Sequence, residues 1–304
     1  MAKTAIRIPR LRKLTKKQAK QKAKKQAKKL KPIPGSFNLL KQVFSDWSRY
    51  WKPLGGVFLI FLILNLLFAS SFIGGINASL SSVKTDLNGT HNLSKAVSGV
   101  GTLFNSGGNT QGSSGMQSAL LVIGSLAFIW SLRRLYAGEK LKIKLAYYQS
   151  MAPLIPFILV IFVILLQLLP IILGAAALAL LLSSSSGASG AVVAISVIPI
   201  ALLAVWSFYM ISSSIFALYI VTLPDMQPRQ ALRSAKELVK FRRWQIMRRL
   251  LFLPICILLL LGIIMVPLIL LASFLVTAVF FVLALLALPF IHTYLYNLYR
   301  GLVG

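Results

Sequence analysis

Residues 153–182 read PLIPFILVIFVILLQLLPIILGAAALALLL, and this run decides the fold class of the chain. It contains no charged side chain and is longer than the roughly 20 residues that an α-helix needs to cross the hydrocarbon of a bilayer. Over all 304 residues, 57% are hydrophobic, 12% are charged, and the mean hydropathy is +0.80. Because a soluble domain carries about 25% charged residues, this composition excludes a soluble protein and indicates one that lipid surrounds.

Other apolar stretches lie on both sides of this run. We predict six membrane spans, at about residues 54–75, 116–132, 153–182, 191–223, 250–271 and 274–295. The third and fourth spans are long enough to tilt or kink, and Pro170 and Pro199 are the expected kink positions. Only a short turn near Ser273 separates the last two, so five spans are the alternative. The predicted fold class is all-α: a polytopic α-helical membrane protein with about six transmembrane helices plus interfacial amphipathic helices.

Basic residues gather on one side of the predicted spans. The chain has 33 Lys and Arg against five Asp and Glu, which gives a formal net charge of +28. Only Lys84 and Lys95 fall on one side, whereas the other 31 lie in segments 1–53, 133–152, 224–249 and 296–304. Lys and Arg accumulate on the cytoplasmic side of membrane proteins. Both termini are therefore predicted to be cytoplasmic.

The N-terminal segment differs from the rest of the chain. Residues 1–31 hold 14 Lys or Arg and no Asp or Glu, and their mutual repulsion favours disorder in water. We therefore divide the chain into a basic, disordered cytoplasmic tail, residues 1–35, and a six-span membrane domain, residues 36–304. Anionic lipid headgroups, RNA and the ribosome are the expected partners of residues 1–31. The alternative is a solvated tail that only reinforces the orientation of the protein.

An amphipathic helix is predicted just before the first span, where residues 36–52 read SFNLLKQVFSDWSRYWK. At about 100° per residue, the apolar side chains fill one half of the helical wheel and the polar ones fill the other. Such a division is typical of a helix lying in the membrane interface. The alternative is a helix docked on a protein core.

No cluster of residues indicates catalysis or metal binding. The five acidic residues are scattered, Cys256 is the single cysteine, and His91 and His292 lie far apart in sequence. General acid–base catalysis, nucleophilic catalysis and metal binding therefore lack a candidate constellation. The polar residues inside the spans, Asn65 and Gln167, are expected to form hydrogen bonds between helices. We predict that the protein is not an enzyme and needs no cofactor.

Residues 224–249, PDMQPRQALRSAKELVKFRRWQIMRR, carry a resemblance to a known family. They resemble a helix in uncharacterised bacterial polytopic membrane proteins related to the membrane domain of glycerophosphodiester phosphodiesterases. Phe241 stands where that helix usually has glycine. The matching residues are Ala231, Leu232, Ser234, Leu238, Val239, Lys240 and Trp244. The resemblance implies a membrane domain in a bacterial cytoplasmic (inner) membrane. It implies no known activity, because the catalytic domain of the phosphodiesterases would be a separate barrel and the chain has no room for one.

The same segment supplies the candidate site. A helix beginning near Pro228 would place Ala231, Leu232, Ala235, Leu238 and Val239 on one face and Arg233, Lys236, Glu237 and Lys240 on the other. The residues that follow are the candidate contacts to anionic lipid, through guanidinium groups that reach lipid phosphates: Arg242, Arg243, Arg248, Arg249 and Trp244. The alternative is that the apolar face packs on neighbouring helices and the arginines only retain the loop in the cytoplasm.

Three functions remain open from the sequence. The leading hypothesis is a non-enzymatic integral inner-membrane protein that organises lipids or partner proteins through basic interfacial helices. The second is a transporter or channel for a small neutral solute, which would use the kinked spans. The third is a membrane anchor that binds ribosome or nucleic acid through the lysine-rich tail.

Overall fold

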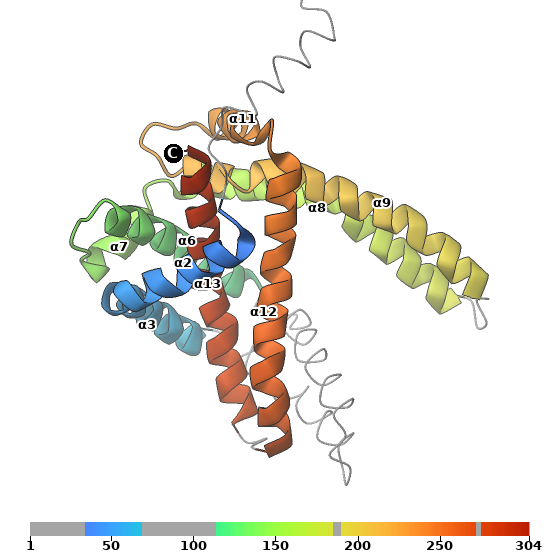
Figure 1. Ribbon diagram of the computed structural model, residues 1–304, viewed down its shortest axis with the longest axis horizontal. Helices are drawn as coiled ribbons and strands as arrows, with labels where there is room; N and C mark the ends of the chain where they lie inside the picture. The colour runs from blue at the N-terminus through green and yellow to red at the C-terminus, as the bar shows by residue number, and fades with distance from the viewer. Residues whose placement is uncertain (1–33, 69–113, 185–189, 272–274, 304) are drawn as a thin grey trace, which may run out of the picture. The chain divides into compact units, whose positions relative to one another are not determined.

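A computed structural model of the chain describes residues 34–68, 114–184, 190–271 and 275–303 (Figure 1). Every regular element in these ranges is an α-helix, and six helices are long and apolar enough to cross a membrane. The prediction of an all-α polytopic protein is therefore confirmed. The last two predicted spans are separate helices, which favours six spans over five. The tail up to Ile33, most of the loop at 76–115 and the turn near Ser273 lie outside the described residues.

The predicted interfacial helix is two elements in the structure. Helix α2 (Ser36–Arg49) ends at a turn at Tyr50, and Trp51 already belongs to α3 (Trp51–Phe68), the first span. The apolar half of α2 contacts other helices, because α2 packs on α3 and α13. Its buried side chains are Leu39 and Val43, and the rings of Phe37 and Phe44 lie edge-on against Phe252 and Phe290.

Four spans and one short helix share a buried core. α3 packs against α6 (Ser114–Tyr136), and α6 packs against α13 (Val276–Val303), which also runs beside α12 (Arg243–Leu271) (Figure 1). The short helix α7 (Ile143–Ser150) contacts α3 and α6. The core residues are Val57, Phe61, Ala127, Phe128, Ala146, Met265, Ile269, Val276, Phe280, Phe281 and Leu285. We call α3, α6, α7, α12 and α13 the bundle.

Helices α8 (Leu154–Ser184) and α9 (Gly190–Ser214) run side by side and form a hairpin (Figure 1). Both continue through the expected kink positions, Pro170 and Pro199. The predicted fourth span, residues 191–223, is not one helix, because α9 ends at Ser214 and a separate turn, α10 (Ala217–Ile220), follows. Serine hydroxyls compete for backbone groups, and those at the end of α9 bond to the carbonyls of Tyr209 and Met210.

Two helices extend beyond the predicted spans near the basic segments. Helix α12 begins at Arg243, seven residues before the predicted span, and α13 continues to Val303 through the predicted 296–304 tail. The extra turns are stabilised by tertiary contacts that hydropathy does not report. The last turns of α13 are packed on other helices, with Tyr294 and Leu298 fully buried. The helix before α12, α11 (Pro228–Val239), begins at a proline, which suits the first turn of a helix.

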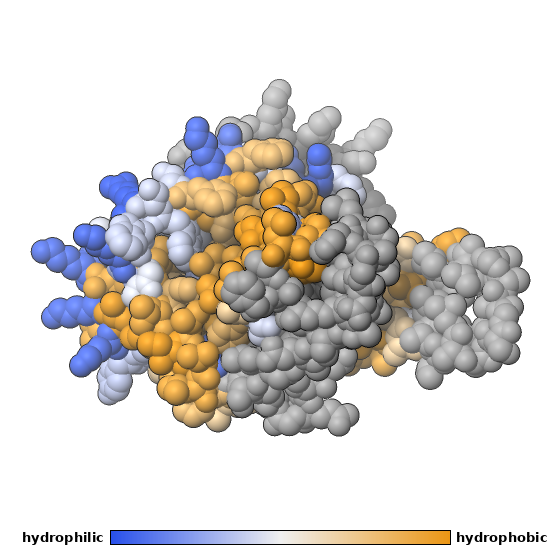
Figure 2. Space-filling view, turned by 90° about the horizontal axis from the view of Figure 1, so that it is seen from below, coloured by the Kyte–Doolittle hydropathy of each residue, from blue (hydrophilic) through white to orange (hydrophobic). Residues whose placement is uncertain are grey.

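The surface of the described residues is largely apolar. In the coloured part of Figure 2, hydrophobic side chains cover much of the face and hydrophilic side chains gather along the left and upper edges. Exposed large hydrophobic residues occur on all six spans and are most numerous on α8 and α12. A surface of this kind is stable against lipid tails and unstable against water.

Candidate functional site

Polar contacts join helix ends that lie far apart in sequence. The hydroxyl of Tyr136, at the end of α6, has one proton to donate and lies within hydrogen-bond distance of two acceptors, the carboxylate of Asp46 on α2 and the amide oxygen of Asn297 on α13, the latter at 2.7 Å. The Asn297 amide nitrogen donates to the same carboxylate at 2.8 Å. The guanidinium of Arg300 covers the Tyr136 ring at 4.3 Å. The contacts place the basic end of α6 beside α2 and the C-terminal end of α13.

Arg133 joins α6 to the segment after α9 through further polar contacts. Its guanidinium donates to the carbonyl of Thr222 at 2.6 Å, to the Thr222 hydroxyl at 2.6 Å and to the carbonyl of Tyr219 at 3.0 Å. These acceptors belong to the end of α10 and the turn after it, where carbonyls lack partners within a helix. Arg133 therefore fixes the segment that leads from α10 to α11 against α6.

A buried polar pair lies behind these contacts. The hydroxyl of Tyr219 is 3.1 Å from Nδ1 of His292, and both side chains are buried. The ring of Tyr219 also stacks on Tyr299 and touches Tyr296. The Tyr219 hydroxyl and the His292 Nδ1 atom are each other's buried partner, so we interpret the pair as a packing feature of α10 and α13.

The five residues predicted to contact anionic lipid lie at the start of α12. Trp244 is 67% exposed and Arg248 is exposed, while Arg242, Arg243 and Arg249 are half-buried. Arg243 lies 4.7 Å from the ring centre of Tyr209 on α9. Tyr294 donates to the backbone carbonyl of Arg249 at 3.2 Å. The structure thus places Arg242 in the turn just before α12 and the other four residues on the first two turns of this helix.

The apolar face of α11 is covered by protein. Its residues Ala231, Ala235 and Val239 have no exposed surface, and α11 packs against α8, α9, α10 and α13. On the opposite face, Arg233 and Glu237 form an exposed ion pair. The alternative in which this face packs on neighbouring helices therefore describes α11 correctly. The packing of α11 does not decide the role of the arginines that follow it, because they lie at the start of α12.

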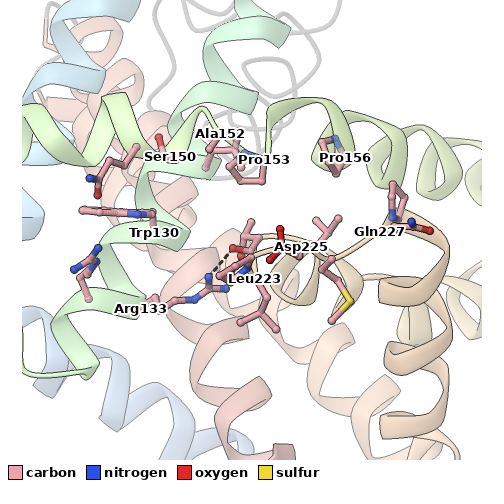
Figure 3. A pocket seen from close by; sticks show the side chains of 17 residues that line it. Trp130, Arg133, Ser150, Ala152, Pro153, Pro156, Leu223, Asp225 and Gln227 are labelled. Carbon is pink, nitrogen blue, oxygen red and sulfur yellow. Dashed lines mark hydrogen bonds between the residues drawn. The ribbon is translucent and has the colours of Figure 1, made fainter.

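A cavity lies between α6, the start of α8 and the segment before α11 (Figure 3). Its volume is about 830 Å³. Trp130 and Arg133 come from α6, Ala152, Pro153 and Pro156 lie at the start of α8, and Leu223, Asp225 and Gln227 come from the segment before α11. Figure 3 shows the Asp225 side chain between these walls. We call this cavity the α6–α8 pocket.

Sequence reasoning missed this pocket. The Arg133–Arg134 pair at the end of a span was interpreted only as an orientation signal, and Asp225 only as a scattered acidic residue. A combination of Trp130, two arginines and an acid at the ends of three apolar segments is the signal that could have suggested it. No spacing rule connects these residues, because Arg133 and Thr222 are 89 positions apart.

The intramembrane amides behave differently from the prediction. Asn65 donates to the carbonyl of Phe61 on its own helix at 2.9 Å, rather than to another helix. The side-chain oxygens of Asn65 and Gln167 are buried without a hydrogen-bond partner among the described residues. The described part of the chain also contains no group of three or more His, Cys, Asp or Glu side chains that could hold a metal ion.

Comparison with known proteins adds no information about this site. No protein-family model, curated protein or solved structure matches this chain. The resemblance of residues 224–249 to phosphodiesterase-related membrane proteins therefore stays a prediction.

Proposed function

We propose that this chain is a non-enzymatic multi-pass membrane protein that organises anionic lipids through a cluster of arginines at the start of α12. The observation that carries the proposal is the arrangement of Arg242, Arg248 and Arg249. They lie close enough for Arg242 and Arg248 to repel the charge of Arg249. The guanidinium groups of Arg242 and Arg248 form no ion pair or hydrogen bond with the other described residues.

A cluster of like charges is destabilising unless an anion offsets it. The chain itself offers little compensation, because its acidic residues number five against 33 basic ones. Two of the five, Glu139 and Glu237, are paired with Arg134 and Arg233. Lipid phosphates are the anions available at a helix end in a membrane, and arginine binds phosphate through two parallel hydrogen bonds.

The neighbours of the cluster support a position at the lipid headgroups. Trp244 is 67% exposed at the start of a span, which suits the layer between hydrocarbon and water. The placement of 31 of the 33 basic residues favours a cytoplasmic location for this end and for both termini. We infer a bacterial inner membrane from the resemblance of residues 224–249.

The test is lipid retention by the purified protein, measured by native mass spectrometry after exchange into mild detergent. The double variant Arg242→Gln/Arg248→Gln should retain phosphatidylglycerol at least about tenfold less than the wild type, since it loses two charge-assisted phosphate contacts. The matched control is Lys140→Gln/Lys142→Gln, which removes the same charge from exposed positions before α7. Equal loss in both variants would show a dependence on net charge alone and would contradict the proposed site.

A further inference from the structure

We propose that the α6–α8 pocket binds the headgroup of a zwitterionic phospholipid, one that carries a phosphate and a protonated primary amine, such as phosphoethanolamine. This site goes beyond the proposed function, because it uses other residues than the arginines of α12 and selects another headgroup charge. Arg134 would contact the phosphate, and Asp225 would accept hydrogen bonds from the amine.

The pocket changes from apolar to charged along α6. Its lining runs from Leu126 to Arg134 on this helix, a rise of about 12 Å at 1.5 Å per residue. Val221 and two prolines of the α8 region, Pro153 and Pro156, add apolar surface. The volume of about 830 Å³ lies within the range of ligand pockets. A pocket with an apolar end inside a span and a charged end beyond it fits an amphipathic ligand.

The charges in the pocket favour a zwitterion over an anion. Arg134 lies 5.0 Å from the ring centre of Trp130 and forms an ion pair with Glu139, so its charge is partly offset. Asp225 is exposed in the pocket lining and has no side-chain ion pair or hydrogen bond with the other described residues. An anion alone would place a second negative charge beside the Asp225 carboxylate, which repels it. A phosphate joined to an ammonium satisfies both Arg134 and Asp225.

The backbone at Asp225 is an independent sign of a functional constraint. Its φ is +56°, and among the described residues it alone has positive φ without being glycine. This left-handed conformation is disfavoured for residues with a Cβ atom, although Asp and Asn tolerate it better than most. Glycine would remove the strain, but it would also remove the carboxylate. Strained backbone conformations of this kind concentrate at active sites and ligand sites. At Asp225 the strain is present although glycine would relieve it.

Arg133 is a positioning residue for this site. By donating to the carbonyls of Tyr219 and Thr222, it anchors the segment that carries Asp225 three residues further on. Two nearby amides, Gln149 and Gln227, also line the pocket and can donate to phosphate or accept from the amine. The pocket thus offers a carboxylate on an anchored segment, a cation and neutral polar groups, as a headgroup with two opposite charges requires.

The experiment uses the full chain, delipidated in mild detergent and mixed separately with four lipids of equal chain length. The lipids are phosphatidylethanolamine, phosphatidylcholine, phosphatidylglycerol and diacylglycerol, and native mass spectrometry measures the bound fraction. We expect the wild type to retain phosphatidylethanolamine several-fold better than phosphatidylcholine, whose methylated amine has no N–H to donate. Asp225→Asn and Asp225→Gly should each reduce phosphatidylethanolamine retention about tenfold, since a hydrogen bond to a charged group is lost.

The two variants guard against misfolding, because asparagine tolerates the left-handed backbone and glycine adopts it freely. Glu237→Gln, which removes an exposed carboxylate on α11 outside the pocket, is the matched control and should leave retention unchanged. Arg242→Gln/Arg248→Gln should lose phosphatidylglycerol and keep phosphatidylethanolamine, which separates this site from the proposed function. Equal retention of phosphatidylethanolamine and diacylglycerol, or unchanged retention in Asp225→Gly, would overturn the inference. Displacement by an equal concentration of free phosphoethanolamine would overturn a lipid as the ligand.

Discussion

Helices α6 and α8 are both membrane spans by length and composition, yet they differ in what surrounds them. In the span window of α6, 44% of the residues are buried inside the protein, against 11% in that of α8, although α8 is the more apolar. α6 carries Phe128 and Ala127 into the core of the bundle. α8 pairs with α9, and its described residues from 161 to 177 include none that is buried.

This difference shows that hydropathy ranks exposure to lipid rather than burial in protein. Lipid tails are as apolar as leucine, so no hydrophobic force drives one span onto another. Helices join where side chains interlock and polar groups find partners. α6 has such partners at its end, Arg133 and Tyr136, whereas the middle of α8 offers mainly branched and aromatic apolar residues. The hairpin surface is therefore available to lipid or to another protein.

The largest test of this comparison is to remove a phenyl ring from each region. Phe128 has no exposed surface and lies edge-on to Phe61, while Phe162 on α8 is 59% exposed. Phe128→Ala should lower the free energy of unfolding by about 3–5 kcal/mol, because it leaves a cavity in the core. Phe162→Ala should change it by less than about 0.5 kcal/mol. Unfolding in detergent measures both, and equal losses would mean that the hairpin is packed as tightly as the bundle.

Adding atoms sharpens the same comparison. A Cβ atom on Gly124 of α6 would lie 2.5 Å from the ring of Phe61, whereas one on Gly262 of α12 meets nothing within 4 Å. Because Phe61 is buried against Phe128, it cannot move away freely. Gly124→Val should destabilise the protein by about 1–3 kcal/mol through overpacking. Gly262→Val is the control, with the same change in helix propensity, and a thermal shift as large there would contradict the proposed close approach of α3 and α6.

Polar contacts should stabilise the packing of helices on one another, because apolar contacts between helices gain little over contacts with lipid tails. Asp46→Ala removes the acceptor shared by Tyr136 and Asn297, and we expect a loss of about 1–2 kcal/mol because the Asn297 amide nitrogen loses its acceptor and the Tyr136 hydroxyl keeps only the Asn297 oxygen. The control is Glu237→Ala, which breaks an exposed pair with Arg233 and should cost no more than about 0.5 kcal/mol. Chemical denaturation in detergent compares the two. Similar small effects would show that the Asp46 contacts contribute little to the joining of α2, α6 and α13.

The smallest expected effect concerns the hairpin. The side-chain oxygen of Gln167 is buried without a hydrogen-bond partner among the described residues, in a small cavity beside Trp206 and Met210. Gln167→Leu should therefore leave the free energy of unfolding unchanged or raise it by up to about 1 kcal/mol, since an unpaired polar group is costly in an apolar setting. The melting temperature should accordingly stay the same or rise slightly. A clear drop in the melting temperature would reveal a partner for this amide, such as a second copy of the chain.

The segments near the basic ends show where sequence reasoning loses its power. The amphipathic pattern of residues 228–239 correctly predicts a helix with Ala231, Ala235 and Val239 on one face. The pattern alone left open whether lipid or protein covers that face, because both are apolar. The answer, that protein covers it, depends on α8, α9, α10 and α13. The break at Ser214 and the continuation of α13 to Val303 likewise depend on contacts between distant residues.

The sequence by itself determined that the chain is all-α, that it has five or six apolar segments long enough to span a membrane and that its basic residues gather on one side of them. Lipid offers no hydrogen bonds, so each spanning segment must satisfy its own backbone as a helix and expose apolar side chains. Tertiary structure alone decided which spans are buried, and it alone placed Arg133 on Thr222 and Asp225 in the α6–α8 pocket. Those outcomes depend on the shapes and hydrogen-bonding groups that distant segments present to each other, and a transfer free energy between water and hydrocarbon contains no information about either.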